Sequence, residues 1–173
     1  MAASSAAASV NLVTNGNFAT AAFTGWTTIP AASGSDFSVW PNCGPSGEHC
    51  AAFGGTTAGY YDAIQQTLVT TPGQGYQVAF SLYTDSSPRD FQVLWNGTQI
   101  YDNSGVGTDT WIPLSFNEVG TGSDTLTFQG YNVPSFDELT DVSVSSTPEP
   151  AYYPLVALGL LVVPVWRQRR KAA

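Results

Sequence analysis

The chain has 173 residues, of which 43% are hydrophobic and 10% are charged, against about 25% charged in a typical soluble domain. This length suffices for one domain with a buried core, and the hydrophobic share excludes a chain that is disordered by composition. Thirteen acidic residues but only one basic residue precede position 151, which gives residues 1–150 a net charge of −12 and excludes nucleic-acid binding through clustered lysine and arginine.

The first nine residues consist mainly of small side chains, with an Ala-x-Ala pattern at Ala6–Ala8. This pattern matches the small-residue end of a secretion signal. The segment lacks the basic start and the apolar core that such a signal also needs. We interpret residues 1–9 as the remnant of a secretion signal or as a disordered segment.

Residues 10–146 are predicted to form short strands. Apolar residues alternate with small or polar ones over residues 76–83, which is the period-2 pattern of a strand with one buried face. The same alternation recurs in residues 91–95, 112–116 and 126–128. Asn96-Gly97 lies between two apolar runs and is typical of a two-residue type I′ hairpin turn. Because no segment before residue 151 shows helical periodicity, the sequence predicts an all-β fold, a jelly-roll β-sandwich.

Cys43 and Cys50 are the two cysteines, and the six residues between them include two glycines and one proline. Two cysteines are too few for a typical four-ligand zinc site, and their spacing is not that of a Cys-x-x-Cys redox motif. In an exported chain the pair favours a disulfide that closes a small loop and contributes about 2 kcal/mol. We interpret His49, the only histidine, as an ordinary loop residue rather than a metal ligand or a base.

The C-terminal end combines three features in order. Pro148-Glu149-Pro150 is followed by an uncharged apolar stretch, residues 151–166, and then by a basic cluster of Arg167, Arg169, Arg170 and Lys171. As a helix the apolar stretch would span about 24 Å, slightly less than the ~30 Å hydrocarbon core, and long basic side chains can make up part of the difference. We therefore predict a single transmembrane helix at about residues 151–166, with the basic cluster in the cytoplasm and the large domain outside.

This order of features resembles the PEP-CTERM sorting signal of Gram-negative bacteria, here in residues 147–173. In that family an exosortase, a membrane protease-transpeptidase, processes the tail at or near the motif and releases or re-anchors the upstream domain. The resemblance implies a chain that is first anchored in the inner membrane and then moves to the cell surface or outside, commonly in species that make exopolysaccharide. Pro154 and Pro164 depart from the pattern because they interrupt the helix.

Residues 11–146 also resemble the galactose-binding-like jelly rolls, through Asn11–Phe18 with Thr24-Gly25-Trp26, residues 65–85 and Phe136–Val144. Several members hold a structural calcium ion between the first and last strands. The resemblance implies that Asp141 is a calcium ligand, with main-chain oxygens near residues 15–17. Ala19 stands where a glutamate is common, and Thr140 replaces the first aspartate of the final-strand pattern. The alternative role for Asp141 is a strand-end residue bonded to main-chain amides.

Sugar binding requires flat aromatic rings for stacking and polar side chains for the hydroxyl groups. We predict Trp40, Tyr60, Tyr61 and Trp95 as ligand-binding residues, and Tyr83, Tyr101 and Trp111 are further candidates. For each of them, packing in the core or on a strand face is the alternative. Trp26 is expected in the core. Tyr60 and Tyr61 are adjacent, so in a strand they would face opposite ways.

The chain has few residues typical of a catalytic site, since it has one histidine and no Gly-x-Ser-x-Gly motif. Asp137 and Glu138 are adjacent, which argues against a catalytic carboxylate pair on one strand face. The sequence thus favours a non-enzymatic exported protein that associates with extracellular polysaccharide and requires no cofactor. The alternatives are a structural or adhesive matrix protein that binds other proteins, and a small glycoside-active enzyme.

Overall fold

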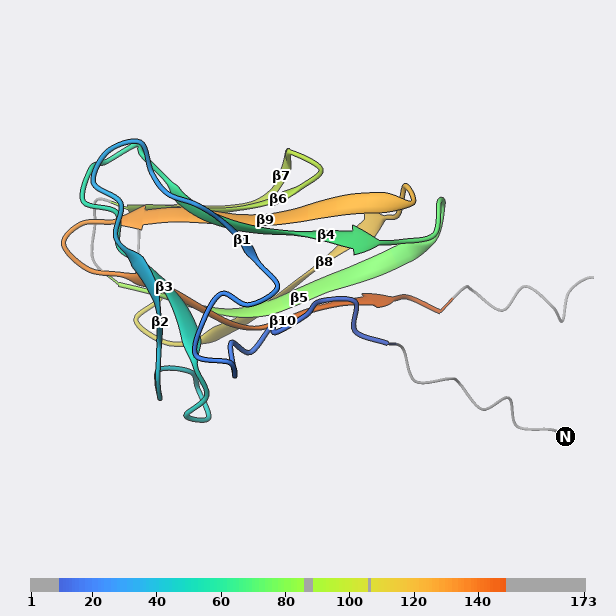
Figure 1. The fold of residues 1–173 in the computed structure, drawn as a ribbon, viewed down its shortest axis with the longest axis horizontal. Helices are drawn as coiled ribbons and strands as arrows, with labels where there is room; N and C mark the ends of the chain where they lie inside the picture. Colours follow the sequence, from blue (N-terminus) through green and yellow to red (C-terminus); the bar gives the residue numbers. More distant parts are fainter. Residues whose placement is uncertain (1–9, 86–88, 106, 149–173) are drawn as a thin grey trace, which may run out of the picture.

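The computed structural model describes residues 10–85, 89–105 and 107–148. These residues form ten strands in two five-stranded antiparallel sheets, which Figure 1 shows as two stacked layers. Sheet A has the strand order β1-β4-β9-β6-β7, and sheet B has the order β2-β3-β10-β5-β8. The strands are β1 (Thr27–Ile29), β2 (Phe37–Trp40), β3 (Cys50–Phe53), β4 (Asp62–Val69), β5 (Gly75–Thr84), β6 (Arg89–Trp95), β7 (Thr98–Ser104), β8 (Ile112–Val119), β9 (Ser123–Asn132) and β10 (Asp137–Ser146).

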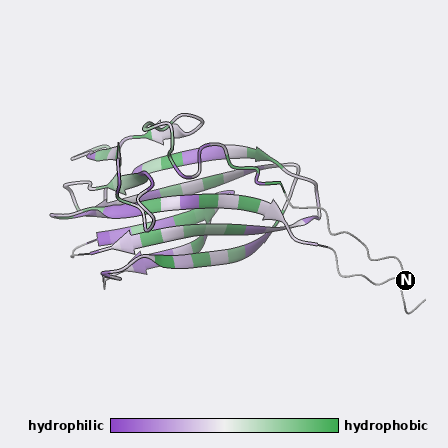
Figure 2. Cartoon of the chain, turned by 90° about the horizontal axis from the view of Figure 1, so that it is seen from below, coloured by the Kyte–Doolittle hydropathy of each residue, from purple (hydrophilic) through white to green (hydrophobic). Residues whose placement is uncertain are grey.

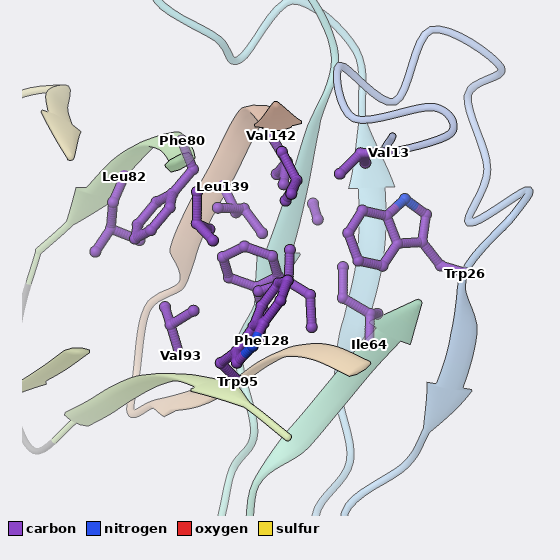
Figure 3. Packing of buried hydrophobic residues seen from close by; sticks show 14 of the residues in the cluster. Val13, Trp26, Ile64, Phe80, Leu82, Val93, Trp95, Phe128, Leu139 and Val142 are labelled. Atoms are coloured by element: carbon purple, nitrogen blue, oxygen red, sulfur yellow. The ribbon is translucent and has the colours of Figure 1, made fainter. Parts of the chain in front are cut away.

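The alternation in the sequence explains how the two layers pack. Along β5 and β9 every second side chain is buried, and Figure 2 shows the corresponding alternation of hydrophobic and hydrophilic bands along the strands. The inward side chains meet in one aromatic core, in which the ring of Phe128 lies 5.2 Å from Phe80, 6.0 Å from Trp26 and 6.4 Å from Phe91. Figure 3 shows this packing around Phe128. Trp26 is 7% exposed, so its predicted core position is confirmed.

The predicted hairpin turn is confirmed. Trp95 of β6 pairs with Thr98 of β7, so only Asn96 and Gly97 connect the two strands. Both have positive φ angles, 52° and 77°, as a type I′ turn requires. Asparagine tolerates this conformation better than most residues do. The Asn96 side-chain oxygen also accepts a hydrogen bond from the main-chain N–H of Thr125 on β9, at 2.8 Å.

The N-terminal segment completes sheet B without forming a regular strand. Strand β10 pairs with β3 through residues 137–139, and beyond that point the main chain of residues 12–16 takes the place of β3. Leu12 N donates to Val144 O at 2.8 Å, and Val142 N donates to Gly16 O at 3.0 Å. Asp141 lies where the neighbour of β10 changes from β3 to the N-terminal segment, in a bulge and with a φ angle of 55°. Asn11–Phe18, which carries part of the resemblance to galactose-binding-like jelly rolls, therefore lies beside the last strand, although it is irregular.

The structure confirms an all-β sandwich of two antiparallel sheets, and no α-helix occurs in the residues that it describes. The predicted disulfide is present, with Cys43 and Cys50 joined and their Cα atoms 5.7 Å apart. In residues 10–85, 89–105 and 107–148 we find no helix that is long and apolar enough to span a membrane. The predicted transmembrane helix at residues 151–166, the basic cluster and residues 149–150 of the sorting motif lie outside the described residues, as do residues 1–9.

Candidate functional site

Polar side chains line the middle of the outer face of sheet A, whereas the exposed apolar residues Ile29 and Val69 lie on β1 and at the end of β4. Gln129 of β9 is the register partner of Ala63 on β4 and of Gln92 on β6, and Gln92 in turn faces Asp102 on β7. These side chains point outward because their neighbours along each strand, such as Phe128 and Val93, are buried. The result is a row of amide and carboxylate groups that runs from β9 across β6 to β7, with Ala63 as its neighbour on β4.

A second outward row lies two residues away along each strand and carries two aromatic rings. Tyr131 of β9 faces Asp90 of β6, and Tyr61 immediately precedes β4 beside Tyr131. The two tyrosine rings are 5.4 Å apart at an interplanar angle of 64°. Both side chains are partly exposed, so they present ring edges and faces next to the amide row. We call Tyr61, Tyr131, Asp90, Gln92 and Gln129 the polar face of sheet A.

A continuous chain of hydrogen bonds holds the polar face in one arrangement. The Tyr61 hydroxyl donates to Asp90 Oδ2 at 2.5 Å, and Gln92 Nε2 donates to the same oxygen at 3.0 Å. Gln129 Nε2 then donates to Gln92 Oε1 at 2.8 Å. A primary amide has two N–H groups and an oxygen with two lone pairs, so each glutamine keeps hydrogen-bonding capacity for a ligand. The internal bonds reduce the number of rotamers that a ligand would have to select.

The electrostatics of this face keep Tyr61 a hydrogen-bond donor. Burial raises the pKa of the Tyr61 hydroxyl, and its hydrogen bond to the Asp90 carboxylate and the charge of that carboxylate raise it further. The phenol therefore stays protonated at any physiological pH. The neighbouring Asp102 is exposed and adds a second negative charge, so the face repels anionic ligands.

The structure divides the predicted binding residues among three places. Tyr61 lies in the polar face, and Tyr60 is 46% exposed in the turn beside it. Trp40 lies on sheet B, on the opposite side of the sandwich, against Phe136. Trp95 is 4% exposed and packs near Phe128 in the core, so its ring is not accessible to a ligand (Figure 3).

Among the further candidates, Tyr83 and Trp111 are paired on sheet B at 5.9 Å, whereas Tyr101 packs against the core residues Phe80 and Phe116. Sequence reasoning missed Asp90, Gln92, Gln129 and Tyr131. The period-2 pattern could have shown that they face outward, but not that they meet.

Asp141 lies where the resemblance to galactose-binding-like jelly rolls implied, beside the N-terminal segment. A hollow of about 360 Å³ is lined by Asn11, Asn15, Gly16, Asn17 and Asp141, with parts of three neighbouring residues. Gly16 O accepts the Val142 amide, and Asn15 O accepts the Trp26 indole N–H at 3.3 Å.

A calcium ion needs six to eight oxygen ligands. The described residues contain no group of three or more histidine, cysteine, aspartate or glutamate side chains suited to a metal ion. Partial burial, and then the nearby carboxyl group of Glu48, raise the pKa of Asp141. The groups available for calcium in this hollow are the Asp141 carboxylate and the main-chain oxygens of residues 15–17. They supply fewer oxygen ligands than calcium normally takes. We therefore base no binding step on a metal ion.

No protein-family model matches the chain, and no curated protein sequence matches it. Solved structures do. A family 61 carbohydrate-binding module, TmCBM61, in complex with β-1,4-galactotriose superposes with a TM-score of 0.64 at 15% identity, over 80% of this chain and 99% of that one. The CBM22-1 xylan-binding domain of Xyn10C from Paenibacillus barcinonensis gives 0.57 at 15% identity, over 84% and 100%.

A third similar structure is the K3 cleaved adhesin domain of Lys-gingipain from Porphyromonas gingivalis. It has a TM-score of 0.61 at 16% identity and covers 80% of this chain and 99% of that domain. The structural neighbours are thus jelly-roll domains of the carbohydrate-binding-module type. At such low identity they establish the fold, and the ligand must be argued from the side chains of this chain.

Proposed function

We propose that the protein is an exported, non-enzymatic surface or extracellular-matrix protein that binds polysaccharide through the polar face of sheet A. The observation that carries this proposal is the hydrogen-bonded chain from Tyr61 through Asp90 and Gln92 to Gln129, with the Tyr131 ring beside it. Amide groups match the hydroxyl groups of a sugar, and an aromatic ring packs against its C–H bonds. The carbohydrate-binding-module fold of the neighbours supports the same ligand class.

The dimensions of the face suit a chain of sugars rather than a single one. Together the two rows extend from Tyr61, next to β4, across β9 and β6 to Asp102 on β7, and three strand spacings of about 4.8 Å make this about 14 Å. Within the described residues the only basic side chain is Arg89, which is 3% exposed. Because Asp90 and Asp102 face the ligand without an exposed cation beside them, the face favours neutral polysaccharides over those rich in uronic acid or sulfate.

Sorting through the C-terminal tail is part of the proposal. Strand β10 ends at Ser146 and the chain then reaches Pro148, the first residue of the Pro-Glu-Pro motif. We infer that an exosortase-type enzyme in the inner membrane processes this tail, and that the sandwich then reaches the cell surface or the exopolysaccharide outside. The support for this step is the order of motif, apolar stretch and basic cluster in the sequence.

Binding to immobilised polysaccharides tests the proposed face. The purified chain is expected to be retained on at least one neutral polysaccharide, and Gln129→Ala and Tyr131→Ala are each expected to weaken retention about tenfold, since each loses contacts worth about 1.4 kcal/mol. Gln77→Ala is the matched control, because Gln77 is exposed on the outer face of sheet B. A chelator is expected to leave retention unchanged.

Two outcomes would contradict the proposal. Equal losses for Gln77→Ala and Gln129→Ala would show that the polar face of sheet A is not the site. Failure to bind any neutral polysaccharide would favour the alternative, a matrix protein that binds other proteins.

A further inference from the structure

The outer face of sheet B carries two further aromatic pairs, with one carboxylate between them. Glu138 of β10 is the register partner of Tyr83 on β5 and of Ala52 on β3. It points outward, because Asp137 and Leu139 on either side are fully buried. Tyr83 forms the first pair with Trp111, at a ring distance of 5.9 Å and an interplanar angle of 44°. This pair therefore lies on the β5 side of Glu138.

The second pair, Trp40 and Phe136, lies on the β3 side of Glu138. The rings are 4.5 Å apart at an interplanar angle of 59°. A Cβ atom at Gly54 would lie 2.2 Å from Phe136 Cε1, so the Phe136 ring lies directly over this glycine. Ala52, two residues before Gly54 on the same outer face of β3, is also small. Because Ala52 and Gly54 are small, the outer face of β3 leaves room for the Phe136 ring between Glu138 and β2.

The carboxylate is partly desolvated and is held in a negative field. Burial, and then the charge of Asp85, raise the pKa of Glu138. Burial also raises the pKa of Tyr83, and the carboxylates of Asp85, Asp109 and Glu138 add to that shift. The sulfur of Cys50 lies 3.9 Å from Glu138 Oε2 and limits access on that side. A carboxylate flanked by aromatic rings, with further carboxylates nearby, attracts organic cations.

We propose that Glu138, with the pairs Tyr83–Trp111 and Trp40–Phe136, forms a second binding site that takes an alkylammonium or guanidinium group. Such a cation pairs with the carboxylate, while its C–H groups and charge lie against the ring faces. Lysine or arginine side chains and the amine of a deacetylated amino sugar all carry this chemistry. The site lies on the opposite side of the sandwich from the polar face of sheet A, so it is independent of the function proposed above.

Titrations followed by tryptophan fluorescence test this site, because Trp40 and Trp111 both belong to it. The probes are methylguanidinium, an oligolysine peptide and a glucosamine oligomer, with the N-acetylglucosamine oligomer of the same length as the uncharged comparison. We expect saturable binding of methylguanidinium and of at least one of the other two cations, and binding at least tenfold weaker for the N-acetylated oligomer. Whichever of lysine peptide and glucosamine oligomer binds more tightly identifies the source of the cation.

Two isosteric variants separate the site from general charge attraction. Glu138→Gln is expected to weaken cation binding at least tenfold, and Glu118→Gln, the same charge change on β8, is expected to have little effect. Equal losses in the two variants, equal binding of the N-acetylated oligomer, or no saturable response to methylguanidinium would overturn the proposal. Retention on neutral polysaccharides is expected to be unchanged in Glu138→Gln, so the two proposals can fail separately.

Discussion

Replacing Asp124 with alanine is expected to lower the free energy of unfolding by about 3 kcal/mol at neutral pH. This carboxylate is fully buried and connects three loops at one end of the sandwich. It accepts hydrogen bonds from the Thr70 hydroxyl, from the Thr121 amide at 2.9 Å and hydroxyl at 2.7 Å, and from Asn96 Nδ2 at 2.6 Å. Alanine would leave these donors without their acceptor, and the three loops would lose the carboxylate that they share.

The same contacts predict how the contribution of Asp124 depends on pH. Burial alone would raise its pKa, but the hydrogen bonds from Thr70, Asn96 and Thr121 together lower it to about 2. Because this value is below that of the unfolded chain, the contribution is fully present above about pH 4 and is lost as the pH falls towards 2. Asp124→Ala should therefore differ from the wild type less at pH 2 than at pH 7.

Chemical denaturation at both pH values measures these effects. Asp36→Ala is the control, since Asp36 is exposed and its removal is expected to cost less than about 0.5 kcal/mol. A change at Asp124 as small as that at Asp36 would show that the three loops do not depend on this carboxylate.

The fold could be predicted from the sequence where the strands have one buried face. Residues 76–83 can be recognised as a strand, and Asn96-Gly97 as a turn, from the local sequence alone. The alternation of apolar residues and the turn residues are visible without knowing which strand pairs with which. The short strands β1 and β2 could not be predicted in this way. All three residues of β1 are exposed and all four of β2 are half-buried, so neither has an alternating pattern.

The prediction for Trp95 shows what the local pattern could have given. Trp95 has the same parity as Phe91 and Val93, so if those two face the core then Trp95 does as well. The residue type of Trp95 suits a sugar platform, but its position in the strand turns the ring into the core. Tyr61, by contrast, precedes β4, where alternation gives little guidance, and its role depends on partners from other strands.

The candidate site could be predicted only in part, because it depends on register between distant strands. Gln92 and Gln129 are 37 positions apart and touch only because β6 and β9 pair in one register. Nothing in either local sequence fixes that register. The same holds for Glu138, whose aromatic neighbours come from β2, β5 and the segment before β8. The sequence identifies suitable residue types, and strand pairing determines which of them meet.

Asp137 is expected to make the protein less stable as the pH rises from about 4 to 7. Its side chain is fully buried, its Oδ1 accepts from Asn132 Nδ2 at 3.1 Å, and its Oδ2 has no hydrogen-bond partner among the described residues. Burial raises the pKa of Asp137 to about 7, against the opposing effects of Asn132 and Arg89 and with small contributions from Asp85 and Asp90. The folded protein thus holds a proton that the unfolded chain releases near pH 4.

The sign follows from proton binding. Between about pH 4 and 7 the folded state binds more protons than the unfolded state, so the free energy of unfolding falls with rising pH, by at most about 4 kcal/mol, and levels off above pH 7. Asp137→Asn replaces the protonated acid with a neutral group of the same shape. It is expected to remove the part of this slope that Asp137 causes, leaving the smaller parts from Glu138 and Asp141, and to exceed the wild type in stability at pH 8. Denaturation curves at pH 5, 6, 7 and 8 measure the slope, with Asp36→Asn as the control that should retain it. An Asp137→Asn protein with the wild-type slope would show that the buried carboxyl does not take up the proton, and that another group causes the pH dependence.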